Sequence, residues 1–96
     1  MTTTAISSQT AAATSSDITV PDGSSIQVWT DEVLATGESV NIHRTDGGSI
    51  DVPLVTDEHK PARLDGSKTS IAISGPITVK LYKGVTETAT AVLYDA

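Results

Sequence analysis

The chain of 96 residues has no cysteine and no phenylalanine, and its only aromatic residues are one tryptophan and two tyrosines. The absence of cysteine excludes disulfide scaffolds, thiolate zinc sites and thiol nucleophiles. Because large aromatic side chains are scarce, the hydrophobic core must be built from aliphatic residues and is thin. We therefore expect the protein to be stabilised by other copies of itself or by a surface on which it sits.

Basic residues are also few. Six Lys and Arg stand against twelve Asp and Glu, which gives a net charge of −6. An acidic chain repels phosphate groups, so nucleic acid is disfavoured as a partner. No apolar run approaches the roughly 18 residues that a membrane helix requires. We expect a soluble protein that binds neither nucleic acid nor a membrane.

The apolar residues that are present are mostly Ile and Val, and from Asp17 onward they alternate with polar residues. β-Branched side chains pack well on a pleated surface, and an alternation of period two is typical of half-buried strands. About seven or eight short strands, spaced by about 8–12 residues, predict an all-β fold, a small antiparallel β-sandwich that is Ig-like or jelly-roll-like. The residues expected to face its core are Ile26, Val28, Val40, Ile42, Ile71, Ile73, Val79 and Leu81.

Turn signals separate the predicted strands. Asp-Gly pairs begin at Asp22, Asp46 and Asp65, and glycine supplies the positive φ that tight turns need. The pair at Asp46 is followed by a second glycine and predicts a β-hairpin. Pro53 lies in the strand after this hairpin. Since proline cannot donate a ladder hydrogen bond, we expect this strand at a sheet edge or at a bulge.

The opening stretch, MTTTAISSQTAAATSS, contains no charge, no proline and no glycine. It lacks the basic and strongly apolar regions of a secretory signal. Because it has no core of its own, we expect an extended N-terminal arm over residues 1–16, followed by a β-sandwich domain over residues 17–96. The arm would dock through strand-like main-chain hydrogen bonds, with Ile6 as its main apolar contact; the alternative is an unstructured tail.

Motifs of enzyme chemistry are missing from the sequence. It has no G-x-S-x-G elbow, no phosphate-binding glycine loop and no EF-hand ligand pattern. His43, His59 and Asp57 would make a zinc site only if the fold brought them together, and a solvated loop is the favoured interpretation of residues 57–59. We expect no enzyme activity, no cofactor and no bound metal.

Trp29 is phased opposite to Ile26 and Val28 in its predicted strand. Its ring could cover one end of the sandwich. Alternatively, it could face outward as the anchor of an interface, a use for which tryptophan is enriched. The pattern leaves both interpretations open.

The order of motifs along the chain is distinctive. A polar lead-in runs into DITVPDGSSIQVWT, and Ile73-Ser74-Gly75-Pro76 is followed by Val79-Lys80-Leu81 and by a closing strand at Ala91-Val92. This order resembles that of a group of small structural proteins of tailed-bacteriophage virions, with the pattern I-S-G-P-G-x-[YF]-[RK]-V near their end. The chain departs from that pattern by having Ile77 where the group has a second glycine.

The resemblance implies a non-enzymatic capsid decoration, or cement, protein on the outer capsid surface of the virion. It would bind the major capsid protein through its N-terminal arm and one end of the sandwich. The alternatives are a tail-, neck- or fibre-associated virion subunit and a carbohydrate-binding or adhesion module. We expect a homo-oligomer, a trimer, because the core is thin and several weak contacts add avidity. The residues predicted to contact the partner are Thr2, Thr4, Ile6, Gln9, Thr14 and Trp29.

Overall fold

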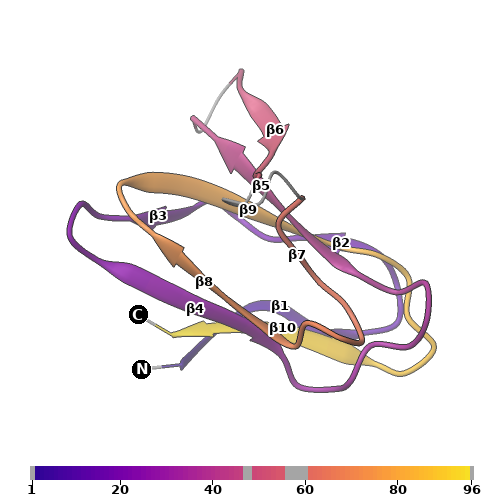
Figure 1. The fold of residues 1–96 in the computed structure, drawn as a ribbon. Helices are drawn as coiled ribbons and strands as arrows, with labels where there is room; N and C mark the ends of the chain where they lie inside the picture. Colours follow the sequence, from indigo (N-terminus) through magenta and orange to yellow (C-terminus); the bar gives the residue numbers. More distant parts are fainter. Residues whose placement is uncertain (1, 47–48, 56–60, 96) are drawn as a thin grey trace.

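The computed structural model describes residues 2–46, 49–55 and 61–95 and shows two antiparallel sheets packed face to face (Figure 1). This confirms the predicted all-β sandwich. The described part of the chain contains no helix long and apolar enough to cross a membrane. Its strands are β1 (Thr2–Gln9), β2 (Ala13–Thr14), β3 (Ile18–Val20), β4 (Ser25–Thr30), β5 (Val40–Thr45), β6 (Asp51–Pro53), β7 (Arg63–Leu64), β8 (Ser70–Ser74), β9 (Ile77–Lys83) and β10 (Thr90–Asp95).

One sheet, sheet A, has the strand order β1-β10-β4-β8. In the other, sheet B, β9 and β5 are central: β2 and β3 pair with β9, and β6 and β7 pair with β5. Along the described strands the chain changes sheet six times, between β1 and β2, β3 and β4, β4 and β5, β7 and β8, β8 and β9, and β9 and β10. Each sheet therefore combines strands that are far apart in the sequence.

The core between the sheets is aliphatic, as the composition predicts. All eight residues expected to face it are buried, and the most exposed of them, Ile71, is only 9% exposed. The other buried apolar residues of the core are Ile6, Ile18, Val20, Leu34, Ala62, Leu64 and Val92. Burying one such Val, Leu or Ile side chain contributes about 1.5–3 kcal/mol, so the core is the sum of many small contributions.

The prediction that the N-terminal segment is an arm separate from the sandwich is wrong. Residues 2–9 form β1, the edge strand of sheet A beside β10, and residues 13–14 form β2 on β9. The segment therefore supplies a strand to each sheet, and the expected boundary after residue 16 does not divide the fold. The physical reason is that β1 satisfies the main-chain groups along the outer side of β10, while Ile6, 4% exposed, completes the core.

The β5–β6 hairpin projects beyond the body of the sandwich (Figure 1). The Asp46 carboxylate accepts a hydrogen bond of 2.9 Å from Ile50 N–H across the turn, which confirms the predicted hairpin; its glycines, residues 47–48, lie outside the described residues. Among the described strands β6 pairs with β5 alone, which confirms the edge position expected from Pro53. Because the hairpin lies away from the core, Ile50 and Val52 are 49% and 48% exposed.

Candidate functional site

The outer face of sheet A is built by residues that the strand register arranges in two rows. Residues directly opposite one another on neighbouring strands share a face of the sheet. The first row is Thr4, Leu93, Trp29 and Ser70, and the second is Thr2, Asp95, Gln27 and Ala72, each in the order β1, β10, β4, β8. These eight residues are termed the sheet A face.

Trp29 faces outward within the first row. Ile26 and Val28 on the same strand are buried, whereas Trp29 is half-buried and belongs neither to the core cluster nor to the residues packed against it. Leu93, its neighbour on β10, is likewise half-buried and outside the core. The structure thus gives Trp29 the outward orientation, and with Leu93 it forms a small apolar patch.

The rest of the sheet A face is almost free of charge. Asp95 is the single ionisable residue among its eight members. Gln27 Nε2 donates a hydrogen bond of 3.3 Å to Ser70 Oγ beside the patch. A partner can cover such a surface at little cost in desolvated charge, and interface cores are depleted of charged residues and enriched in tryptophan. The face thus has two features that docking surfaces share, few charges and an outward-facing tryptophan.

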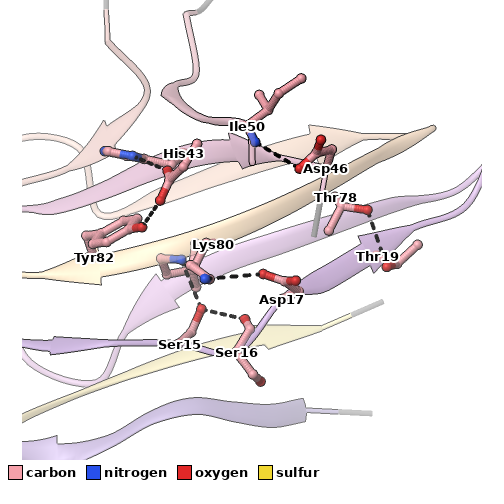
Figure 2. A network of polar contacts seen from close by, with 12 residues as sticks. Ser15, Ser16, Asp17, Thr19, His43, Asp46, Ile50, Thr78, Lys80 and Tyr82 are labelled. Atoms are coloured by element: carbon pink, nitrogen blue, oxygen red, sulfur yellow. Dashed lines mark hydrogen bonds and ion pairs between the residues drawn. The ribbon is translucent and has the colours of Figure 1, made fainter. Parts of the chain in front are cut away.

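The outer face of sheet B has a different character (Figure 2). His43 Nδ1 on β5 lies 2.7 Å from Asp51 Oδ1 on β6, and the Tyr82 hydroxyl on β9 donates to the other carboxylate oxygen. The rings of His43 and Tyr82 lie 4.2 Å apart, centre to centre. The hydrogen bond from Tyr82 is the largest cause that lowers the pKa of Asp51, and the hydrogen bond from His43 is the second. The hydrogen bond between Tyr82 and Asp51 also raises the pKa of Tyr82.

These three side chains tie the projecting hairpin to the sandwich. An imidazole that a carboxylate orients can serve as a general base. Here, however, the three residues come from three strands, and their contacts hold the base of the β5–β6 hairpin against β9. Beside them, Lys80 Nζ lies 3.6 Å from Asp17 Oδ1, and the hydroxyls of Thr19 and Thr78 meet at 3.4 Å (Figure 2). The charges of this face are paired within the chain, so a partner that covered it would have to bury ion pairs.

Metal ligands do not gather in the described structure. Within residues 2–46, 49–55 and 61–95 no three His, Cys, Asp or Glu side chains lie where they could hold a metal ion. Asp57 and His59, which the sequence places in a solvated loop, lie outside those ranges. Their interpretation stays a prediction.

The structure brings together three of the six residues predicted to contact a partner. Thr2, Thr4 and Trp29 all lie on the sheet A face. Ile6 requires a correction: its side chain is buried in the core of its own chain and is not available as the main contact of an arm. The physical reason is a bulge in β1, which turns Ile6 inward.

The other two predicted residues lie apart from this face. Gln9 is half-buried at the end of β1, and Thr14 is exposed on β2, opposite Tyr82 in sheet B. Leu93 and Ser70 were not predicted as members of the sheet A face. The outward phase of Leu93 could have been found from its place beside buried Val92, but its position next to Trp29 depends on the pairing of two strands distant in the sequence.

Comparison with known proteins identifies no relative: no family model, no curated protein and no solved structure matches the chain. The likeness to virion proteins therefore rests on the motif residues alone.

Proposed function

We propose that this chain is a non-enzymatic structural protein that docks on a larger protein assembly through the sheet A face. The observation that carries the proposal is the outward-facing pair Trp29 and Leu93, set in a sheet face with one ionisable side chain. The motif around Ile73-Ser74-Gly75-Pro76 supports a specific form of it. In this form the protein is a capsid decoration protein, bound to the major capsid protein on the outer surface of a phage virion.

Energetics favour docking by several copies at once. A side chain such as Leu93 contributes about 1.5–3 kcal/mol when it passes from full exposure to full burial, and a tryptophan hot spot costs about 2 kcal/mol or more on truncation. Lost translational and rotational freedom opposes association by about 4–15 kcal/mol. One sheet A face is therefore a weak binder. Three copies that assemble as a trimer on the shell would present three such faces and gain affinity through avidity, which is the reason to retain that prediction.

A sheet face takes the place of the detached arm in this proposal. Thr2 and Thr4 still contribute, but as members of β1 fixed beside β10. Because their backbone is already ordered in the free protein, docking does not carry the cost of about 1–2 kcal/mol per residue that ordering a free arm would require. A preformed surface binds more tightly for the same contacts.

The test is cosedimentation of the purified protein with bare capsid shells of the phage that carries it. Trp29→Ala and Leu93→Ser should each raise the dissociation constant about tenfold or more, because each removes apolar contact from the docking face. Val85→Ser is the matched control. It removes a side chain that is 70% exposed and lies outside the sheet A face, and it should bind like the wild type.

Each outcome decides one part of the proposal. Binding by the wild type that both Trp29→Ala and Leu93→Ser leave unchanged would place the docking surface elsewhere. Binding to isolated tails or fibres but not to shells would establish the alternative position in the virion. A wild-type protein that sediments with neither would overturn the virion form of the proposal.

A further inference from the structure

The free edges of the two sheets differ in how well they are protected against pairing with a further strand. Native edge strands avoid such pairing by being very short, by bulges, or by charge and proline. In sheet B, the strands at the edges are β2, β3, β6 and β7, each two or three residues long, and β6 ends in Pro53. In sheet A, β1 has two register shifts against β10. These four short strands and β1 are therefore poor templates.

β8 has none of these protections. It pairs with β4 over the five residues Ser70–Ser74 in an uninterrupted register, and it contains no charge and no proline. Among the described strands β4 is its only partner. Its other side can therefore present main-chain N–H and C=O groups to a strand of another molecule.

The sequence of β8, Ser-Ile-Ala-Ile-Ser, reads the same in both directions. When two copies of it lie antiparallel about a two-fold axis at Ala72, Ser70 lies opposite Ser74, Ile71 lies opposite Ile73, and Ala72 lies opposite its own copy. Every side chain then lies opposite an identical side chain on the same face of the sheet. We propose that two copies of this chain associate edge to edge through β8 and join their two sheets A into one continuous sheet.

A groove beside β8, lined by both polar and apolar side chains, extends the surface that a second copy can cover. The groove lies between β8 and the segment that contains Leu54 and Val55, and Lys68 is also part of its lining. Val55 on its rim is 55% exposed. Ile71 and Ile73 are already buried in the core of their own chain, so the apolar surface that a second copy covers lies on the exposed rim of the groove, as at Val55, and the two-fold axis repeats that contact in the other copy. One pairing therefore removes apolar surface from water twice.

Charge and size set the strength of this dimer. Each copy carries a net charge of −6, so two copies repel each other at long range. The repulsion is least at β8, which is uncharged, and Lys68 adds a positive charge at the groove. Two five-residue strands bury less than the roughly 1,200 Å² at the low end of stable interfaces, so the dimer forms at high local concentration. The pairing extends the sheet A face without covering it, and it does not depend on the proposed function.

The test uses the residue that the two-fold axis places opposite itself. Ala72 is exposed, so Ala72→Lys and Ala72→Glu should both fold, which circular dichroism checks. Each variant alone sets two like charges about 5 Å apart in the pair and should remain monomeric in sedimentation equilibrium at concentrations where the wild type dimerises. An equimolar mixture of the two sets opposite charges together and should form the dimer again. Thr19→Lys adds the same charge on the outer face of sheet B and should dimerise like the wild type.

Four results would overturn the proposal. They are a wild type that stays monomeric up to millimolar concentration, Ala72→Lys that dimerises like the wild type, a mixture that stays monomeric, and a wild-type trimer that Ala72→Lys leaves intact. Recovery of the dimer in the mixture alone supports it, because only an antiparallel pair centred on Ala72 brings those two side chains together.

Discussion

Thr4 and Ile6 point to opposite faces of sheet A although only Ala5 separates them. Thr4 lies opposite Leu93 and Ile6 lies opposite Val92, so β1 contains one residue more than β10 between the two pairs. In a regular strand, residues two apart share a face, and one extra residue reverses that phase. The bulge therefore sets Thr4 on the sheet A face and turns Ile6 into the core.

Ile6→Ala is expected to lower the free energy of unfolding by about 2–5 kcal/mol, the range for truncating a buried aliphatic side chain. Ile6 is 4% exposed and lies in the core cluster. Urea unfolding measures the change. Ser8→Ala, at an exposed position of the same strand, is the control and should shift stability by less than about 0.5 kcal/mol. If Ile6→Ala is as stable as the wild type, Ile6 does not contribute to the core, and the opening segment is a separate arm as predicted from the sequence.

The fold could be predicted where strands are regular. In β4 and β9 the buried positions alternate with more exposed ones, so Val28 and Leu81 could be assigned to the core from the sequence. In β1 the two bulges remove that alternation, and one isoleucine cannot display a period. The position of β1 in sheet A depends on its pairing with β10, which lies near the other end of the sequence. Strand partners cannot be identified from a single sequence.

The candidate site could be predicted only in part for the same reason. The outward phase of Trp29 follows from its own strand. Its neighbour Leu93 follows from the register of β10 against β4, which packing sets. The contact of His43 with Asp51 and Tyr82 likewise needs three strands in place.

Gly75→Ala is expected to destabilise the protein by about 1–3 kcal/mol, because a Cβ at this position has no room. It would overlap the carbonyl oxygens of Val20 and Pro21. Main-chain atoms of a paired strand and its turn cannot swing aside as the end of a long side chain can. Gly84→Ala is the matched control, since the nearest atom to its Cβ would be the Ser39 oxygen at 3.6 Å. Thermal unfolding of the two variants side by side checks this, and equal midpoints would contradict it.

Asp51 should make the stability of the protein fall in acid. Tyr82, and next His43, lowers the pKa of Asp51 below its ordinary value of 3.8. The unfolded chain therefore binds a proton at a higher pH than the folded protein does. The stabilisation is fully present above the ordinary value and is lost as the pH falls toward the lowered pKa of the folded state.

The measurement for Asp51 is urea unfolding between about pH 7 and pH 3. Asp51→Asn has no charge to lose, so its unfolding free energy should fall less steeply than that of the wild type below about pH 5. Tyr82→Phe removes the largest cause of the shift and should give an intermediate slope. Asp22→Asn, in the turn between β3 and β4, controls for the loss of a carboxylate. Parallel curves for wild type and Asp51→Asn would contradict the prediction.

Ile26 and Trp29 lie on the same strand and should respond differently to truncation. Ile26 is 5% exposed, so Ile26→Ala should cost about 2–5 kcal/mol of unfolding free energy. Trp29→Ala should cost less, because its ring lies on the outer sheet face and outside the core cluster. Denaturant unfolding of the two variants measures the difference, and a larger loss for Trp29→Ala would reverse the assignment.

The fluorescence of Trp29, the single tryptophan of the chain, should report docking directly. In the free protein its half-buried ring contacts water, so we expect emission at long wavelength and efficient quenching by acrylamide. When bare shells are added, burial of the ring should shift the emission to shorter wavelength and reduce the quenching. Leu93→Ser, which weakens the same patch, should require more shells for the same shift. A free protein whose emission is already at short wavelength and protected from acrylamide would place Trp29 in the core, and the docking face would lose its anchor.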